Sequence, residues 1–303
     1  MKKVLILGGQ GRLARALLAT QPLGLNVCAV SRAALDITQS KDFEALIQTF
    51  EPHVVINAAA WTDVGGAQAH RDEVFRVNAV APAKIASTLA QRNIPLVHYS
   101  TDYVFSGEGH TPWYEDSVTA PKVAGVYGLS KWEGEKAVRE SGVRGVVIRA
   151  GWLHTGERDF VAAILMAALA KKPLKVTASQ IGTPTQTESL ARWTWQNLPL
   201  FEAQTSTLVI HYVESGGWVT RAEFADYLLQ SAETSCARQG LEAMKEAFRD
   251  ARLGLTITEE IDDIRPANCR LATRYLERFS GGPCWKKGVD KSVENVIKSK
   301  MRS

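Results

Sequence analysis

The chain has 303 residues, of which 45% are hydrophobic and 22% charged, a composition typical of a globular protein that can bury a sizeable core. Its formal net charge is +4, and the whole surplus lies after Cys284, because the preceding residues carry equal numbers of basic and acidic side chains. So small and local a surplus argues against a nucleic-acid groove, and no apolar run reaches the roughly 18 residues of a membrane span.

The four cysteines lie far apart and form no C-x-x-C pair, so neither a disulfide framework nor a zinc site is indicated. The six histidines show no spacing typical of metal ligands. The apolar run Val4–Leu7 is too short for a signal peptide. We therefore expect reduced thiols, no bound metal and a cytoplasmic location.

Over the first 150 residues, short apolar runs alternate with amphipathic segments, which predicts βαβ units around a parallel sheet buried on both faces. Strands are expected at Val4–Leu7, Leu25–Val30, His53–Ile56, Pro95–Tyr99 and Gly145–Ile148. Helices are expected at 11–20, 40–49, 71–92 with a kink at Pro82, and 128–140. The pattern predicts an α/β fold with a Rossmann-type doubly wound parallel sheet.

The alternation changes after Arg149, which indicates a second, smaller α/β domain. The elements expected there are a helix at Phe160–Ala170, a loop at Gln180–Thr187, a helix at 188–197, a strand at Leu208–Tyr212, a helix at Arg221–Ala232 and a less regular tail. The basic stretch at the C-terminal end of this tail is expected to be helix-like with a solvated surface. We therefore expect an NAD(P)-binding Rossmann domain at 1–150 and a second domain at 151–303. The strand at 208–212 is a candidate to return to the first sheet.

A glycine-rich turn, Gly8-Gly9-Gln10-Gly11, directly follows the first strand and opens the first helix. At such a helix start, backbone amides and the helix dipole can hold the diphosphate of a dinucleotide. Gly8 permits the tight turn, and Gly11 lets a phosphate approach the backbone. The expected contact residues are Gly8, Gln10, Gly11, Arg12 and Leu13. A tight turn without a ligand is the alternative interpretation.

The second strand ends at Val30-Ser31-Arg32, where NAD-binding folds usually have an acidic residue for the ribose 2′-hydroxyl. The guanidinium of Arg32 suits a 2′-phosphate instead, which predicts NADPH as the cofactor. Asp36 can contact the adenine side, so NADH remains the alternative cofactor. A solvated surface side chain is the alternative interpretation of Arg32.

Tyr127 and Lys131 have the Y-x-x-x-K spacing, which places both side chains on one helix face. A phenol titrates at about 10, and we expect the neighbouring ammonium to lower the pKa of Tyr127. Thr101 follows the fourth strand, at the sheet edge where doubly wound folds bind ligands. These residues predict a hydride-transfer site in which Thr101, Tyr127 and Lys131 are catalytic and Lys131 also holds the nicotinamide ribose.

Further motifs occur along nearly the whole chain. They are Gly8-x-x-Gly11, Leu35-Asp36-Ile37-Thr38, Asn57-Ala58-Ala59-Ala60-x-Thr62, Ser100-Thr101-Asp102-Tyr103-Val104-Phe105, Tyr127-x-x-x-Lys131, Gln180-x-Gly182-x-Pro184-Thr185 and Arg265-Pro266-x-Asn268. With these motifs the chain resembles the dTDP-4-dehydrorhamnose reductase family of extended short-chain dehydrogenases/reductases. Nucleotide-sugar dehydratases have an Asp-Glu pair after the matching Thr, whereas here Tyr103 takes the position of that Glu.

The resemblance implies NADPH-dependent reduction of the 4-keto group of a nucleotide-linked deoxy sugar, with dTDP-4-dehydro-L-rhamnose converted to dTDP-L-rhamnose. It implies that residues 151–303 mainly bind the nucleotide sugar and that the chain can form a homodimer. It adds Ile37, Asn57, Ala58 and Ala59 to the cofactor contacts. The residues that it places at the substrate are Thr62, Asp102, Tyr103, Trp152, Gln180 and Arg265.

Several positions near the expected sugar pocket depart from the family pattern. Gly65 and Gln68 replace two acidic residues, Gly151 precedes Trp152 in place of Ser or Thr, Asp159 replaces Asn, and two residues are inserted between Pro121 and Tyr127. One alternative is therefore a reductase or epimerase for a different nucleotide 4-keto-sugar. The other is a catalytically silent nucleotide-binding regulatory subunit, against which the intact Thr101, Tyr127 and Lys131 count.

Overall fold

The computed structural model describes residues 1–121, 125–261, 263–279 and 281–302. A six-stranded sheet forms its centre, and neighbouring strands in this sheet are parallel. In spatial order the strands are β10 (Thr207–His211), β5 (Gly145–Ala150), β4 (Leu96–Thr101), β3 (Val54–Asn57), β1 (Lys2–Leu7) and β2 (Leu25–Val30). The strand order reverses between β1 and β3, and doubly wound sheets bind ligands at such a point. The predicted Rossmann-type fold is confirmed.

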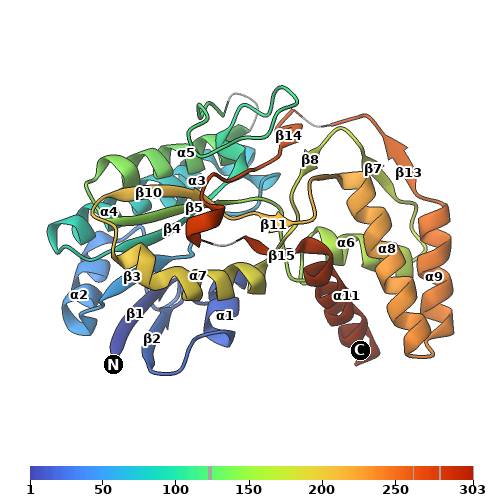
Figure 1. The fold of residues 1–303 in the computed structure, drawn as a ribbon, viewed down its shortest axis with the longest axis horizontal. Coiled ribbons are helices and arrows are strands. Elements are labelled where there is room, and N and C mark those ends of the chain that lie inside the picture. Colours follow the sequence, from blue (N-terminus) through green and yellow to red (C-terminus); the bar gives the residue numbers. More distant parts are fainter. Residues whose placement is uncertain (122–124, 262, 280, 303) are drawn as a thin grey trace.

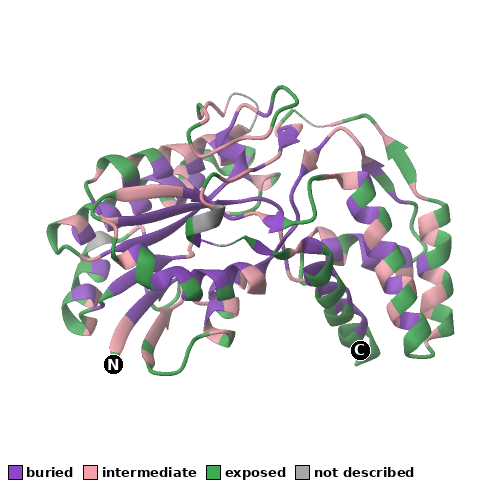
Figure 2. Cartoon of the chain, viewed as in Figure 1, coloured by how far each residue is buried: buried purple, intermediate pink, exposed green. Residues whose placement is uncertain are grey.

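Helices cover both faces of this sheet (Figure 1). One face carries α1 (Arg12–Ala19) and α7 (Thr187–Glu202), and the other carries α2 (Ser40–Phe50), α4 (Ala81–Gln91) and α5 (Gly125–Glu140). Because side chains alternate along a strand, Val4 and Ile6 pack toward α1, whereas Leu5 and Leu7 pack toward α2 and α4. The strands β1, β3, β4 and β5 are largely buried, whereas β2 and most of β10 are partly buried (Figure 2). Two cores therefore hold the carboxyl ends of the inner strands in place.

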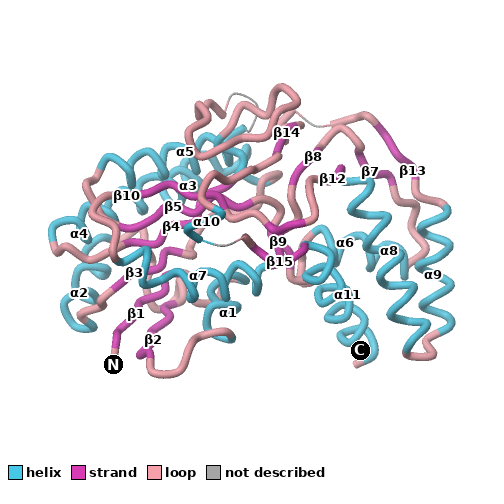
Figure 3. Tube along the Cα trace, viewed as in Figure 1, coloured by secondary structure: helices cyan, strands magenta, loops and turns pink. Residues whose placement is uncertain are grey.

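Beside the sheet, four helices and Trp152 share another core. The helices are α6 (Phe160–Leu169), α8 (Arg221–Arg238), α9 (Glu242–Leu253) and α11 (Trp285–Met301). Short strands connect them (Figure 3). These are β6 (Leu153–His154), β7 (Lys175–Thr177), β8 (Ile181–Gly182), β9 (Thr185–Gln186), β11 (Glu214–Ser215), β12 (Val219–Thr220), β13 (Thr256–Thr258), β14 (Asn268–Cys269) and β15 (Gly282–Cys284). The one-turn helix α10 (Leu276–Phe279) lies between β14 and β15 in the sequence.

The helix expected at 71–92 is confirmed as continuous helical backbone with an irregular middle. After a 3-10 turn, η1 (Gly66–His70), α3 (Arg71–Phe75) passes through a π-helical turn, η2 (Arg76–Val80), into α4. Pro82 is the second residue of α4, so the irregular turn lies directly before the proline at which a kink was expected.

Two expectations were wrong after residue 150. The segment Gln180–Thr187, expected as a loop, contains β8 and β9. The tail, expected to be less regular, contains α9, whereas α11 confirms the helix-like C-terminal stretch. Trp285, Val289, Val293 and Ile297 of α11 are buried at helical spacing, while its lysines are exposed, so the basic surplus forms a solvated helix face. Within the described ranges, no helix is long and apolar enough to span a membrane.

Candidate active site

The glycine turn leaves bare backbone at the point where the strand order reverses. Gly8 follows β1 with a φ of 82°, a left-handed conformation that favours glycine. A Cβ atom on Gly8 would lie 2.8 Å from the Cα atom of Ala59, so the turn packs directly on the segment after β3. Gly11 is the N-cap of α1, and its amide donates to the Gly8 carbonyl at 2.8 Å. The unpaired amides of the first turn of α1 therefore fit a diphosphate.

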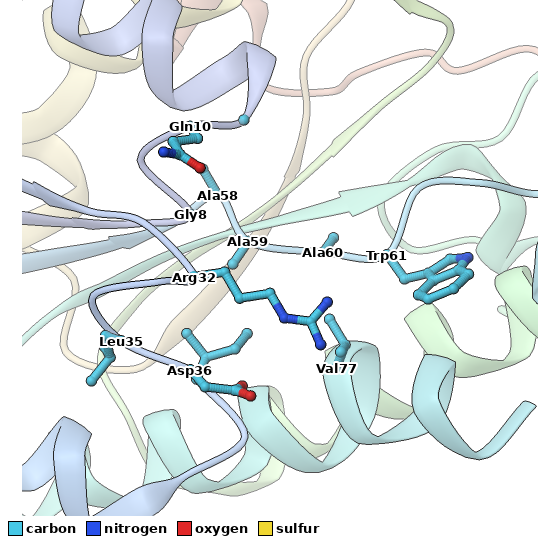
Figure 4. A pocket seen from close by; sticks show the side chains of 12 residues that line it. Gly8, Gln10, Arg32, Leu35, Asp36, Ala58, Ala59, Ala60, Trp61 and Val77 are labelled. Carbon is cyan, nitrogen blue, oxygen red and sulfur yellow. The ribbon is translucent and has the colours of Figure 1, made fainter. Parts of the chain in front are cut away.

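Three cavities follow the carboxyl edge of the sheet. The first cavity (Figure 4) is lined by Gly8, Gln10, Gly11, Arg32, Leu35, Asp36, Ile37, Ala58, Ala59, Ala60, Trp61 and Val77. The second is lined mainly by Gly11, Arg12, Leu13, Thr62, Thr101, Asp102, Tyr103, Tyr127, Lys131, Trp152 and Arg221. The third adds Asp159, Phe160, Lys175, Gln180, Glu260 and Arg265. Shared lining residues join the first to the second and the second to the third, so the three form one path.

Arg32 and Asp36 border the first cavity (Figure 4). Nη2 of Arg32 lies 3.1 Å from Oε1 of Glu73 in α3. Oδ1 of Asp36 accepts hydrogen bonds from the amide and hydroxyl of Thr38, and the bond from the amide is the main cause that lowers the pKa of Asp36. A cation and an ionised carboxylate therefore border the same end of the cavity.

Four other residues expected at the cofactor lie in or directly behind the wall of the first cavity. Ile37, Ala58 and Ala59 line the first cavity. Asn57 is buried beneath it, where Nδ2 lies 3.1 Å from Nδ1 of His98 and Oδ1 accepts the Ala59 amide at 3.1 Å. Asn57 thereby shapes the backbone of the cavity wall.

Arg12 and Leu13 line the second cavity, and Arg12 also borders the third. Nη1 of Arg12 lies 3.5 Å from Oδ2 of Asp159, which is the N-cap of α6. Arg12 was expected at the cofactor. It lines the second and third cavities but not the first cavity, which Arg32 borders.

Thr101, Tyr127 and Lys131 come together in the second cavity. Thr101 ends β4, and its hydroxyl donates to Oδ1 of Asp102 at 2.9 Å. The Tyr127 ring, on α5, meets the Tyr103 ring edge to face with 5.6 Å between centroids. One turn further along α5, Nζ of Lys131 donates to the Tyr99 carbonyl at 2.7 Å. One strand end and one helix face therefore present a hydroxyl, a phenol and an ammonium to the same space.

Burial determines the pKa values of these groups. Burial lowers the pKa of Lys131 to about 8, and the Glu135 carboxylate acts in the opposite direction. Burial raises the pKa of Tyr127 to about 12, although a hydrogen bond with the Thr101 side chain opposes the shift. The expectation that Lys131 lowers the pKa of Tyr127 was wrong for this structure, because Lys131 bonds a backbone carbonyl and burial dominates. A neutral phenol is the form that can donate a proton.

Asp102 is buried beside Thr101, and burial raises its pKa to about 6 despite the hydrogen bond from Thr101. Thr62 lines the second and third cavities, as do Tyr103 and Trp152, and Arg265 lines the third. Nε2 of Gln180 lies 3.2 Å from the Pro266 carbonyl and 3.4 Å from the Tyr103 hydroxyl. The residues that the resemblance places at the substrate therefore border one continuous space.

Arg221 was not expected at the site. Its guanidinium carbon lies 3.5 Å from the centroid of the Trp152 ring, and its Nε donates to Oε1 of Gln180 at 2.9 Å. Arg221 is the first residue of α8, which begins with a capping box formed by Thr220 and Glu223. The T-x-x-E pattern could have located this helix start, but nothing local in the sequence indicates that it faces Trp152.

The departures from the family pattern have local explanations at two positions. A Cβ atom on Gly151 would lie 3.0 Å from the Thr183 carbonyl and 3.2 Å from Oδ2 of Asp102, so the position is crowded. Asp159 caps α6 through the Ala162 amide and also accepts the amides of Thr155 and Gly156. The insertion before Tyr127 falls partly on residues 122–124, which lie outside the described residues.

In the part of the chain that the structure describes, no group of three or more His, Cys, Asp or Glu side chains could hold a metal ion.

The chain is similar to known proteins over most of its length. The family model described as RmlD substrate binding domain matches residues 1–297. A dTDP-4-dehydrorhamnose reductase of Mycobacterium tuberculosis (strain ATCC 25618 / H37Rv) is 34% identical over 222 residues, covering 71% of this chain and 71% of that protein. A dTDP-4-keto-6-deoxy-D-glucose reductase of Streptomyces niveus is 35% identical over 192 residues, covering 62% and 66%.

Among solved structures, a dTDP-4-dehydrorhamnose reductase from Bacillus anthracis in complex with NADP has the same fold. Its TM-score is 0.83 at 24% sequence identity, and the match covers 97% of this chain and 99% of that one.

Proposed function

We propose that this chain is an NAD(P)-dependent oxidoreductase that reduces the 4-keto group of a nucleotide-linked deoxy sugar. The chain belongs to the RmlD substrate binding domain family. The observation that carries this proposal is the second cavity. Thr101, Tyr127 and Lys131 line it together, and it continues into the glycine turn on one side and past Trp152 on the other.

NADPH is the proposed cofactor, with NADH as the alternative. The Gly8–Gly11 turn and the first amides of α1 would hold the diphosphate, and Arg32 would bind the 2′-phosphate. Asp36 and Ile37 would lie at the adenosine end, and Ala58 and Ala59 would line the wall. The NADP complex of the Bacillus anthracis protein, which has the same fold, is in line with this choice. When bound, the cofactor supplies a hydride.

The residues of the chain would hold the carbonyl and supply the proton. The Thr101 hydroxyl would donate a hydrogen bond to the keto oxygen, and the neutral phenol of Tyr127 would transfer its proton to that oxygen. Lys131, held by the Tyr99 carbonyl, would bind the nicotinamide ribose as an ammonium. Leu13 and Trp152 add apolar walls to the same cavity.

The substrate that we propose is dTDP-4-dehydro-L-rhamnose, with dTDP-L-rhamnose as the product. Tyr103, Asp102 and Trp152 would contact the sugar, and the nucleotide would extend into the third cavity toward Gln180 and Arg265. Residues 1–150 with β10 would then serve as the cofactor domain and residues 151–303 mainly as the nucleotide-sugar domain. A cytoplasmic location and a homodimer stay predictions from the sequence.

A reductase for another nucleotide keto-sugar is the second candidate. The departures from the family pattern at Gly65, Gln68 and Gly151 favour it, and Gly151 lines the second cavity. The test is NADPH oxidation by the purified chain with dTDP-4-dehydro-L-rhamnose and with UDP- and GDP-linked 4-keto-sugars. We expect the dTDP sugar to give the highest kcat/KM. A higher value with another sugar would reassign the substrate, and cofactor binding without oxidation of any sugar would favour the silent regulatory subunit.

A further inference from the structure

A buried carboxylate lies one helical turn beyond Lys131 on the same face of α5. It belongs to Glu135, whose side chain is 1% exposed. We propose that Glu135 is a positioning residue of the active site. Its carboxylate, held by Arg149 and Ser100, fixes the helix that carries Tyr127 and Lys131 to the strand that carries Thr101, and it supplies a counter-charge for the Lys131 ammonium. This inference rests on the proposed function.

The contacts of Glu135 join three elements. Its Oε2 atom accepts hydrogen bonds from the Ser100 hydroxyl at 2.8 Å and from Nε of Arg149 at 3.0 Å, and its Oε1 atom pairs with Nη2 of Arg149. Ser100 of β4 and Arg149 of β5 face each other in the register of the two strands. One carboxylate from α5 therefore binds both strands at the same level of the sheet.

The residues on either side of Ser100 in β4 belong to the proposed active site. Ser100 stands between Tyr99, whose carbonyl accepts Nζ of Lys131, and Thr101, whose hydroxyl faces the second cavity. By bonding Ser100, Glu135 fixes α5 relative to the two β4 residues on which the site depends. A shift of about 1 Å between catalytic groups can cost on the order of 100-fold in rate.

The adjacent face of α5, formed by Ser130 and Gly134, is confined as well. A Cβ atom on Gly134 would collide with the Asn78 carbonyl in η2, so the helix already lies against that backbone. The Asn78 side chain bonds the Ser130 hydroxyl at 3.0 Å and the Trp61 backbone. The contact with η2 and the bond to Ser100 therefore hold two adjacent faces of α5.

The charges around Lys131 give Glu135 its electrostatic role. Burial lowers the pKa of Lys131, and Glu135 is the carboxylate that raises it. His98 of β4 faces Lys131 as a neutral ring, because burial and the lysine charge hold the pKa of His98 well below its usual value. Tyr127 on α5 is neutral too. Loss of the Glu135 charge would therefore favour a neutral Lys131.

Glu135 itself remains ionised. Burial acts to raise its pKa, but the charge and hydrogen bonds of Arg149 and the Ser100 hydroxyl hold the pKa below its usual value. Arg139 contributes from the exposed side of α5, with Nη1 3.9 Å from Oε1 of Glu135. Arg149 in turn contacts His211 of β10, 3.2 Å from Nε2, whose pKa burial lowers to about 3. The network thus holds one carboxylate, two guanidinium groups and a neutral imidazole.

The test compares Glu135→Gln, the double variant Glu135→Gln/Arg149→Met, and Glu294→Gln as the matched control, which removes a carboxylate from the exposed Glu294–Lys298 pair of α11. The readouts are the melting temperature and the pH profile of kcat/KM for NADPH-dependent reduction. Glu135→Gln leaves Arg149 buried without its counter-charge, so its melting temperature falls. The double variant removes both charges and recovers much of the melting temperature.

Both variants that lack Glu135 should lose activity at a lower pH on the alkaline side, by about one pH unit, because Lys131 loses its proton earlier. Glu294→Gln keeps the wild-type profile. A folded double variant with the wild-type kcat and the wild-type alkaline limb would overturn the proposal, since Glu135 would then serve only as half of a structural pair.

A third variant tests the positioning role while the ion pair stays intact. Ser100→Ala removes the bond between α5 and β4, so we expect kcat to fall at least about fivefold at an unchanged alkaline limb. A wild-type kcat in folded Ser100→Ala would contradict this role, even if the charge variants failed to fold. Failure of the proposed function has a different signature, namely a wild-type chain that oxidises no NADPH with any keto-sugar.

Discussion

The guanidinium carbon of Arg221 lies 3.5 Å from the centroid of the Trp152 ring, and the two side chains border the second and third cavities together. Gln180 accepts the Nε hydrogen of Arg221, and Trp152 packs against Gly182, where a Cβ atom would lie 2.6 Å from the ring. The contact therefore holds a cation at a defined place between the proposed sugar site and the proposed nucleotide site. A fixed cation there suits the diphosphate of a nucleotide sugar.

Arg221→Met should weaken binding of the nucleotide sugar while the chemistry is preserved. Hydrogen bonds to charged groups contribute about 1.5–3 kcal/mol, so we expect KM for the sugar to rise at least about tenfold, with KM for NADPH unchanged. Arg238→Met, at the exposed end of the same helix, is the matched control and should match the wild type. Steady-state kinetics with each substrate varied in turn decides the matter. An unchanged sugar KM would remove Arg221 from the proposed site.

Tyr127→Phe should nearly abolish turnover, because the proposed proton donor is lost while the ring and its contact with Tyr103 remain. A positioned acid contributes about 10²–10⁴-fold, so we expect a fall of that order in kcat and little change in NADPH affinity. Tyr227→Phe, whose hydroxyl contacts Asp290 far from the cavities, serves as the control. Retention of most activity by Tyr127→Phe would show that another group donates the proton.

Arg32→Ala should change the choice of cofactor. The 2′-phosphate of NADPH would lose its guanidinium partner, so we expect KM for NADPH to rise about tenfold and KM for NADH to stay constant. Glu73→Gln should act in the opposite direction, because Glu73 pairs with Arg32 at 3.1 Å and competes with a phosphate for it. Equal effects of Arg32→Ala on the two cofactors would show that Arg32 does not read the phosphate.

Glu214→Gln should remove a pH dependence of stability. The Glu214 side chain is buried between the Gln186 amide and the Tyr212 hydroxyl, and burial raises its pKa from 4.5 to about 8. Between these values the folded chain holds a proton that the unfolded chain releases. The contribution of Glu214 to stability is therefore complete below pH 4.5 and is lost as the pH rises toward 8.

Urea denaturation at several pH values measures this effect. The free energy of unfolding of Glu214→Gln relative to the wild type should increase with pH, by at most about 1.4 kcal/mol per pH unit in that interval. Groups such as His154, which titrate in both proteins, cancel in the difference. Parallel pH profiles for the two proteins would contradict the assignment of a proton to Glu214.

Local sequence patterns were sufficient for the doubly wound sheet. β2 lies at Leu25–Val30 as predicted, and the glycine turn after β1 borders the cavity that its spacing indicates. Thr101, Tyr127 and Lys131 line one cavity. This grouping could be predicted because local periodicity indicates where the strand ends and which residues share a helix face. Their catalytic roles stay predictions.

Features that depend on contacts between distant segments could not be predicted. The π-helical turn at Arg76–Val80 carries Asn78, whose side chain bonds Trp61 and Ser130, and no local pattern contains those bonds. The pKa of Tyr127 depends on burial by the assembled cavity. Arg221 becomes a site residue only through Trp152. The helix α11, in contrast, could be predicted from the C-terminal stretch, because its apolar residues recur at helical spacing.

During synthesis, β5 is completed well before β10, the strand that pairs with its outer edge. β10 pairs with β5 from Thr207 to His211, yet the segment between the two strands builds much of the neighbouring core. Until β10 leaves the ribosome, β5 presents an open edge that includes the apolar residues Val146, Val147 and Ile148. Unpaired apolar edges template association with other chains. A nascent chain stalled before Thr207 would therefore need a chaperone to shield that edge.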